Sequence, residues 1–347
     1  MRVHVFLRSA GEGVEARRKR RVLRCFHEGL VAAGEDTHLV SGSGYERCEV
    51  AVVLGGRPSA KRVRTRSVRE EIFSGHDGVF VFIETPLFGR NVYQRPPMMA
   101  YLRKLLRLGR NRYSDEYGYY RVGVNGFLQD DADFNNAGSP PDRWAHMSVD
   151  LGLTLKPYRR NGRHVLIVGQ NPGDASLRGA DIFAWMHGTA VAARRLSDRP
   201  IIVRPHPVTP RGMMREFEAR FSTLPGIVVD YPPTRPVRAV LEDCWVLLAY
   251  SSSASIDALI EGVPCITSSP ANMAWPVSDH SLERIEQPTL FAREQWLADM
   301  AYAQWSPQEM QSGATWRHLR PAVARALASP HLAPAPPALE LRGLASA

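Results

Sequence analysis

Short apolar segments alternate with polar loops and with segments of helical spacing through the second half of the chain, and this alternation is what most constrains the fold. Apolar runs of this length, bounded by turn residues, predict buried strands. Strands that alternate with helices predict a mostly parallel sheet, which binds ligands at the carboxyl ends of its strands. The predicted strands are residues 165–168, 201–204, 227–229, 245–249 and 264–267.

The first half follows the same pattern less regularly. Residues 117–134 are expected to be irregular, because glycines at 118, 123 and 126 interrupt them. A polar stretch at 135–141 comes before the expected domain junction. The predicted strands are residues 3–7, 50–54 and 79–83, and the predicted helices are residues 15–33 and 98–108.

We therefore expect two α/β domains. The 347 residues, 44% of them hydrophobic, suffice for two cores. We place the first domain at residues 1–155 and the second at 156–328, and we expect the tail at 329–347, which contains several prolines, to be disordered. The composition excludes a wholly disordered chain, a collagen-like repeat and a small disulfide-stapled protein.

A cytoplasmic location is expected. No apolar run approaches the ~20 residues that cross a bilayer, and the first residues resemble an opening strand rather than a signal peptide. Cys25, Cys48, Cys244 and Cys265 are widely spaced and form no C-x-x-C pair. They predict reduced, mostly buried thiols rather than a disulfide framework or a zinc site.

The chain is basic, with a formal net charge of +9, and the basic residues are densest at 17–21 and 57–69. Such a face can meet nucleic acid, anionic lipid or an acidic glycan, or it can simply be a solvated helix face. No RNP-like, zinc-finger or KH signature is present, and aromatic residues do not interleave with the charges. We therefore expect no nucleic-acid partner, whereas an acidic membrane surface stays an alternative.

Three loops of the second half carry residues suited to chemistry. After the strand at 201–204 comes Arg204-Pro205-His206-Pro207, in which two prolines hold the histidine rigidly enough to present an imidazole to a phosphate oxygen. The alternative is an ordinary His-Pro loop dipeptide.

The second loop follows the strand at 245–249 and opens a helix with Ser251, Ser252, Ser253 and Ser255. Hydroxyls and backbone N–H groups at a helix start form an anion site, although a plain N-cap needs only one serine. Glu261 ends that helix, where it can accept hydrogen bonds from a ribose or merely stop the helix.

The third loop, residues 169–176, holds Asp174 between Gly173 and Ala175 at a strand end. A carboxylate held there can act as a nucleophile or a base, and the alternative is an Asx turn or an N-cap. Because parallel strands end at one edge of their sheet, we expect the three loops to converge.

Together these motifs resemble a known enzyme group. The His-Pro pair followed by the serine run resembles the motifs of CMP-sugar-dependent GT-B enzymes, the bacterial sialyltransferases and Kdo transferases. Gln170 with Gly173-Asp174-Ala175-Ser176, about thirty residues before the His-Pro pair, resembles the retaining β-Kdo transferases of capsule and lipopolysaccharide synthesis. The segment 296–305, with Glu309, Gly313 and Trp316, resembles the end of that group, so the resemblance covers roughly residues 160–320.

The resemblance implies a GT-B-like α/β architecture, with two Rossmann-like domains facing a central cleft. It implies that Asp174 attacks the anomeric carbon of Kdo, that CMP leaves, and that an acceptor hydroxyl then displaces the aspartate with retention. His206, Ser252 and Ser253 would hold the phosphate, and Arg204 is a candidate for the sugar or phosphate anion. The donor-binding residues implied are Gln170, Ser176, Arg204, His206, Ser251, Ser252, Ser253 and Glu261.

The first domain would then bind the acceptor, a surface polysaccharide or a glycolipid, and Glu84, Arg121 and Asn125 are our candidates for that side. The basic face would allow peripheral contact with the inner membrane. We expect neither a metal nor another cofactor beyond the donor CMP-Kdo, because the charge of a departing monophosphate can be offset by an imidazole and a helix N-terminus.

Other interpretations stay open. Asp130-Asp131-Ala132-Asp133 contains the Asp-x-Asp pattern that binds a metal in GT-A enzymes, but no clear strand precedes it and we interpret it as a solvated acidic turn. A GT-B enzyme with another donor would use CMP-sialic acid, a nucleotide diphosphate sugar or phosphoribosyl pyrophosphate. A non-catalytic GT-B scaffold that binds glycan is the alternative from a different class.

Overall fold

The computed structural model describes residues 1–11, 13–42, 44–56, 68–89, 118–207, 209, 211–222, 224–231 and 235–329. The helix predicted at 98–108, most of the basic segment 57–69 and all but the first residue of the predicted tail at 329–347 lie outside this part of the chain. The chain divides into two compact units. Unit 1 comprises residues 1–127, 131–152 and 297–333, and unit 2 comprises residues 128–130, 153–296 and 334–347.

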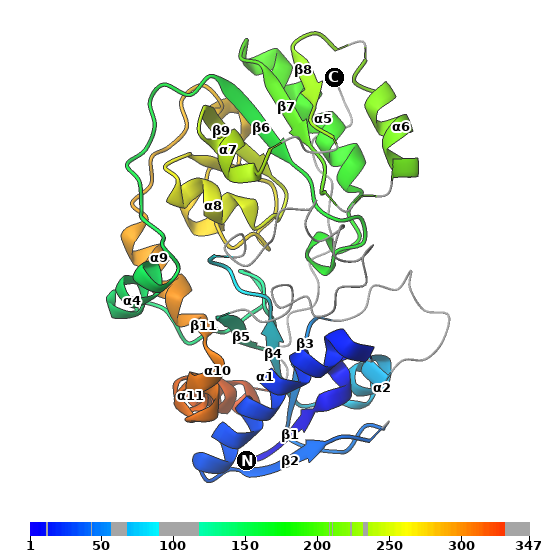
Figure 1. Ribbon diagram of the computed structural model, residues 1–347, viewed down its shortest axis with the longest axis vertical. Helices are drawn as coiled ribbons and strands as arrows, with labels where there is room; N and C mark the ends of the chain where they lie inside the picture. Colours follow the sequence, from blue (N-terminus) through cyan, green and yellow to red (C-terminus); the bar gives the residue numbers. More distant parts are fainter. Residues whose placement is uncertain are drawn as a thin grey trace, which may run out of the picture. The chain divides into compact units, whose positions relative to one another are not determined.

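The sheet of unit 1 has the strand order β11-β5-β4-β3-β1-β2 (Figure 1). Strands β1 (Arg2–Phe6), β2 (Asp36–Val40), β3 (Val50–Leu54) and β4 (Val79–Glu84) are parallel. On the far side of β4, β5 (Tyr120–Val124) is antiparallel to β4, and β11 (Gln304–Trp305) is antiparallel to β5. The helices of this unit are α1 (Gly13–Ala32), α2 (Val68–Gly75), α4 (Asp142–Asp150), α10 (Pro307–Gln311) and α11 (Ala314–Ala328).

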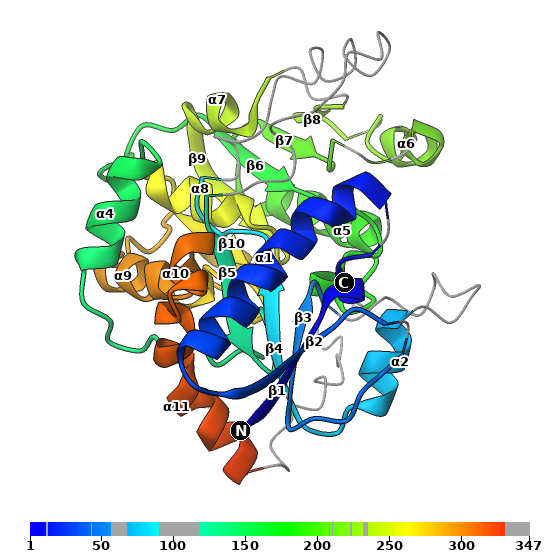
Figure 2. The same ribbon diagram turned by 60° about the horizontal axis from the view of Figure 1, so that its bottom comes forward.

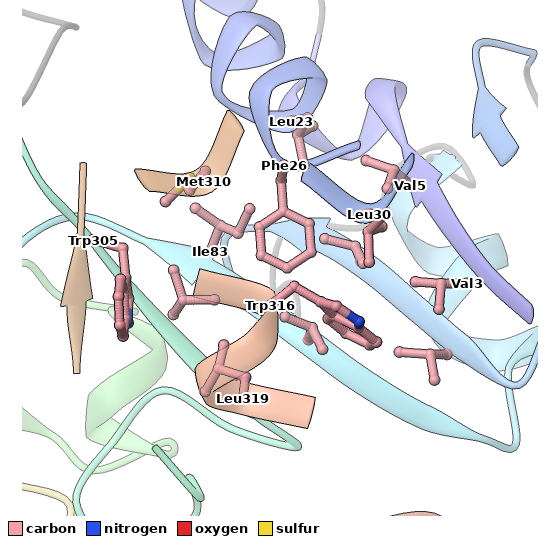
Figure 3. Packing of buried hydrophobic residues seen from close by; sticks show 14 of the residues in the cluster. Val3, Val5, Leu23, Phe26, Leu30, Ile83, Trp305, Met310, Trp316 and Leu319 are labelled. Atoms are coloured by element: carbon pink, nitrogen blue, oxygen red, sulfur yellow. The ribbon is translucent and has the colours of Figure 1, made fainter. Parts of the chain in front are cut away.

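The two faces of this sheet bury different residues because side chains alternate along each strand. Val3 and Val5 of β1 face α1 and α11, which lie side by side on one face (Figure 2). Phe26 of α1 and Trp316 of α11 meet there edge to face, with ring centroids 6.3 Å apart (Figure 3). On the opposite face, Phe6 packs in a second cluster with Ile72 of α2.

The end of the chain corrects our domain boundaries. We expected residues 156–328 to form one domain, but residues 297–328 belong to unit 1. The reason is packing: Trp305 of β11 lengthens the first sheet, and Trp316 and Leu319 of α11 fill its core. Helix α9 (Glu294–Tyr302) contains the crossing point between the units.

A second correction concerns the segment at 117–134, which we expected to be irregular. Its residues 120–124 form β5, which is buried along its whole length. Gly123 fits because a Cβ there would lie 2.6 Å from the carbonyl oxygen of Gly126. This glycine therefore marks a close backbone approach beside a strand rather than an interruption of the strand.

Unit 2 contains a fully parallel sheet with the strand order β10-β9-β6-β7-β8, drawn in green and yellow in Figure 1. Numbered within the unit, this is the order 5-4-1-2-3 of a Rossmann-like sheet. The strands are β6 (His164–Val168), β7 (Ile201–Arg204), β8 (Ile227–Val229), β9 (Cys244–Ala249) and β10 (Cys265–Thr267). The α-helices are α5 (Ile182–Leu196), α6 (Arg211–Ala219), α7 (Val237–Leu241) and α8 (Ala254–Ile260).

These observations confirm the predicted α/β class with two Rossmann-like units. All four cysteines are buried and free, as predicted. Among the described residues, none of the helices combines the length and the apolar character needed to span a membrane.

Candidate functional site

The three motif-bearing loops leave three neighbouring strands of unit 2 at the same level. β6 lies between β9 and β7 in the sheet. Val168, at the end of β6, pairs with Ala249 of β9 on one side and with Arg204 of β7 on the other. The loops that carry Asp174, Ser251 and His206 therefore begin at one edge of one sheet, as the sequence predicts.

The first residue of the β6 loop shows how tightly two of these loops approach each other. A Cβ at Gly169 would lie 2.7 Å from Met186 Sδ and 3.3 Å from Pro205 Cα. The N–H of Gly169 donates to the carbonyl of Arg204 at 2.8 Å. Glycine thus lets the chain leave β6 in contact with the backbone of the His-Pro loop.

The carboxylate of Asp174 is exposed, and one of its oxygens is fixed. Asp174 is the N-cap of the short 3₁₀ helix η3 (Ala175–Leu177). Its Oδ1 accepts hydrogen bonds from the backbone N of Ser176 at 2.9 Å and from Ser176 Oγ at 2.8 Å. The N-cap interpretation is therefore correct, and it leaves the carboxylate at the surface with a defined orientation.

Gln170 connects the Asp174 loop to the serine turn. Its Nε2 donates to Ser176 Oγ at 2.7 Å and to Ser251 Oγ at 3.0 Å, while its Oε1 accepts from the backbone N of Ser251 at 3.0 Å. Ser251 Oγ in turn donates to the carbonyl of Ser176 at 2.9 Å. Gln170, Ser176 and Ser251 are all buried, so the network lies in surroundings where each hydrogen bond is strong and each unpaired polar group is costly.

The serines of the run differ in burial. Ser251 belongs to the network above, and Ser255 is buried, with its Oγ 2.8 Å from Asn272 Oδ1. Ser252 and Ser253 are half-buried and lie immediately before α8. Ser252 Oγ lies 3.4 Å from Ala254 N, so its hydroxyl also belongs to the turn at the strand edge.

Asn272 is a residue of this edge that our sequence reasoning missed. It lies after β10 and is fully buried. Besides accepting from Ser255, its Oδ1 accepts from Ala274 N at 2.9 Å, and its Nδ2 lies 3.4 Å from the carbonyl of Tyr250. The sequence signal that could have identified Asn272 is its position after the last strand of the same parallel sheet.

Arg204 occupies a structural ion pair. Its Nη1 lies 2.7 Å from Asp230 Oδ2, and Nη2 donates to the backbone carbonyl of Arg235. The side chain is buried, and this burial lowers the pKa of the guanidinium from its usual value, against the opposing effect of Asp230. The pair fastens the end of β7 to the segment that follows β8. A contact of Arg204 with the donor stays a prediction.

His206 lies half-buried in the loop after β7, where its carbonyl accepts from Thr209 N at 2.9 Å. Glu261 follows α8, and its carboxylate is only 5% exposed. It accepts from Lys156 Nζ at 2.5 Å and from Arg238 Nε at 2.7 Å. The charge of Glu261 is therefore offset by two cations, and its contact with a ribose stays a prediction.

The three candidates for the acceptor side lie in unit 1, at two ends of β4. Glu84 ends β4 and pairs with Arg121 of β5 across the strands. Arg121 is buried, and its guanidinium carbon lies 5.3 Å from the centroid of the Phe127 ring. Asn125 instead accepts from Phe80 N at 3.0 Å near the start of β4, with a left-handed backbone φ of 58°. The structure thus brings Glu84 and Arg121 together and places Asn125 apart.

The Asp-x-Asp segment directs its carboxylates to separate partners. Asp130 forms a two-pronged ion pair with Arg178, at 2.6 and 2.7 Å. Asp131 Oδ1 accepts from Phe127 N at 2.9 Å, and Asp133 Oδ2 accepts from Arg325 Nη2 at 2.9 Å. These contacts suit the interpretation as an acidic turn.

No family model matches the chain, and no curated protein matches it either. Solved structures do match it. Two are β-Kdo transferases. The chain is similar to the β-Kdo 2,4 transferase KpsC of Thermosulfurimonas dismutans, with 15% identity, 87% of this chain and 90% of that chain covered, and a TM-score of 0.49. For the β-Kdo 2,7 transferase KpsC of the same organism, the identity is 11%, the coverage is 93% and 100%, and the TM-score is 0.45.

A further similar structure is the UDP-GlcNAc 2-epimerase of Methanocaldococcus jannaschii in complex with UDP-GlcNAc and UDP. Its identity is 14%, 80% of this chain and 74% of that chain are covered, and the TM-score is 0.30.

Proposed function

We propose that this chain is a glycosyltransferase that transfers Kdo from CMP-Kdo to a surface-polysaccharide or glycolipid acceptor with retention of configuration. The observation that carries the proposal is the buried network of Gln170, Ser176 and Ser251, which orients Asp174 at the edge where the serine turn and the His206 loop also begin.

The position of this network in the sheet supports a ligand site. In the order 5-4-1-2-3, the adjacent strands β6 and β9 are the first and the fourth, so their connections run in opposite directions. Open parallel sheets bind ligands outside the carboxyl ends of the strands at such a switch point. The hydrogen bonds between the β6 loop and the Ser251 turn lie at this switch point.

The proposed chemistry is a double displacement at the anomeric carbon. Asp174 attacks that carbon through Oδ2, while the bond to the CMP phosphate oxygen breaks and its electron pair leaves with the phosphate. An acceptor hydroxyl then attacks the same carbon and gives its proton to solvent water. The bond from that carbon to Asp174 breaks, its electron pair returns to the carboxylate, and two inversions give net retention. Because Ser176 holds Oδ1, the carboxylate needs little reorientation before it attacks.

His206, Ser252 and Ser253 receive the departing phosphate in this proposal. An imidazole N–H and two hydroxyls supply hydrogen-bond donors to the developing charge. CMP is therefore expected to raise the melting temperature of the protein, and His206→Ala should reduce that shift. If neither effect occurs, the donor assignment is wrong.

Release of CMP from CMP-Kdo tests the activity directly. Asp174→Asn removes the nucleophile but retains a good N-cap residue, so the fold should survive. Asp181→Asn is the matched control, because Asp181 is another exposed N-cap aspartate, at the start of α5. We expect CMP release by the wild type and Asp181→Asn and its loss in Asp174→Asn, which should still bind CMP. Equal activity of the three proteins would contradict the proposal.

The same assay separates the alternatives. Turnover of CMP-sialic acid, a nucleotide diphosphate sugar or phosphoribosyl pyrophosphate, without turnover of CMP-Kdo, would assign another donor. Glycan binding without any turnover would indicate a scaffold. We expect the activity to persist in EDTA. A strict metal requirement would instead favour a metal site at the Asp-x-Asp segment.

A further inference from the structure

Three potential metal ligands gather in unit 1 around the edge strand β2. They are His4 of β1, His38 of β2 and Glu46 of the segment that follows β2, and their ligand atoms lie within 4.8 Å of one another. None of them belongs to the candidate site of unit 2. The cluster is therefore a feature that the proposed function does not explain.

The sheet register creates this cluster. His4 and His38 are direct partners in the parallel ladder between β1 and β2, so their side chains project from the same face. The two rings meet edge to face, with centroids 5.5 Å apart. Glu46 completes the group, with Oε2 at 2.9 Å from His38 Nδ1.

His4 carries the observation that points to a ligand. The residue is 8% exposed, and its Nδ1 is buried without a hydrogen-bond partner in the described part of the chain. Buried polar atoms are nearly always paired, and an unpaired one costs free energy.

We propose that His4, His38 and Glu46 bind one divalent transition-metal ion of the Zn²⁺ type. Two imidazole nitrogens and one carboxylate oxygen form a donor set that suits Zn²⁺, with water as the remaining ligand. Ca²⁺ and Mg²⁺ prefer sites made wholly of oxygen. The expected effect is to fasten the segment that carries Glu46 to the exposed edge of the sheet.

The required movement is small and falls on exposed side chains. Bonds of about 2.0–2.2 Å to a tetrahedral Zn²⁺ bring ligand atoms to roughly 3.3 Å from one another. The side chains of His38 and Glu46 are 60% and 45% exposed, so they can change rotamer without repacking the core. His4 is held in place in β1, and the other two close onto it.

The test measures metal binding by the full-length chain, freed of any affinity tag and stripped by a chelator. Co²⁺ is titrated while its visible d–d absorption is followed, and Zn²⁺ binding is measured by calorimetry. We expect one ion per chain and a higher melting temperature with Zn²⁺. His38→Ala and Glu46→Gln, both at exposed positions, should each weaken binding by about tenfold or more.

His146→Ala is the matched control, because His146 is an exposed histidine on α4 away from this cluster in the sequence. It should bind Co²⁺ and Zn²⁺ like the wild type. Unchanged affinity in a His38→Ala, Glu46→Gln double variant would overturn the proposal, and so would the absence of binding at millimolar Zn²⁺. Neither metal binding nor the melting temperature depends on glycosyl transfer. A negative result here therefore leaves the proposed function unaffected, and a negative result there leaves the metal site unaffected.

Discussion

At the scale of single residues, buried side chains orient the exposed carboxylate of Asp174. Gln170 donates to Ser176, and Ser176 donates to Asp174. In such a series of hydrogen bonds, each bond polarises the next and strengthens it. The hydrogen bonds thus explain why the loop adopts one conformation and why Asp174, the proposed nucleophile, has a defined orientation.

Ser176→Ala removes the hydroxyl that holds Asp174 Oδ1 and leaves the backbone hydrogen bond in place. A hydrogen bond to a charged group contributes about 1.5–3 kcal/mol, so we expect kcat to fall by roughly 10- to 100-fold. CMP affinity should change little. Ser222→Ala, at an exposed serine of unit 2, is the control. Steady-state kinetics that give equal kcat for both variants would contradict this role.

Gln170→Leu leaves the hydroxyls of Ser176 and Ser251 without their buried donor. Each unsatisfied buried group costs about 1–3 kcal/mol, so the free energy of unfolding in urea should fall by at least that amount. A variant as stable as the wild type would show that the network does not hold the two loops together.

At the scale of elements, the sequence predicts a strand well when both its faces are buried and turn residues bound it. Strands β6, β7, β9 and β10 of unit 2 come close to these conditions. The edge strand β8 exposes Val228, so its short apolar run and the turn residues around it are what predict it. β11 is two residues long, so no pattern could reveal it. The sequence analysis predicts no helix at α11, and the residues of α11 alone cannot identify the sheet on which it packs. Of the candidate site, the convergence of the three loops followed from parallel topology, whereas the bonds of Gln170 depend on side-chain geometry that no spacing predicts.

Glu309 of α10 accepts a hydrogen bond from Arg143 of α4 and makes a pH-dependent contribution to stability. Burial opposes ionisation of its carboxyl, but the hydrogen bonds from Arg143 and Ser306 outweigh this and lower the pKa of Glu309 below its ordinary value of 4.5. A depressed pKa stabilises the folded state above the unfolded value, and this contribution is lost as the pH falls through the folded value. Glu309→Gln should therefore be less stable than the wild type at neutral pH.

The difference between the two proteins should shrink as the pH falls below about 4.5, because both then carry a neutral group. Urea unfolding at neutral pH and at a series of acidic pH values measures this difference. A gap that stays constant with pH would show that Glu309 acts through its capping geometry alone.

At the scale of the whole molecule, the chain returns to its first unit after completing its second. Trp316 belongs to the core of unit 1 and also donates to Glu35 Oε1 at 2.9 Å. Trp316→Ala should lower the free energy of unfolding by about 3–5 kcal/mol. Leu290→Ala, at a residue that is 43% exposed, should have a small effect. Equal thermal stability of the two variants would contradict the assignment of residues 297–328 to that core.

The most direct test of the central claim is to trap the covalent intermediate on Asp174. The protein is incubated with CMP-Kdo without acceptor, quenched in acid, and its intact mass and peptides are measured. We predict a gain of one Kdo residue, located on the peptide that contains Asp174 and absent from Asp174→Asn. An active enzyme whose product has inverted configuration, or whose adduct lies on another residue, would contradict the account.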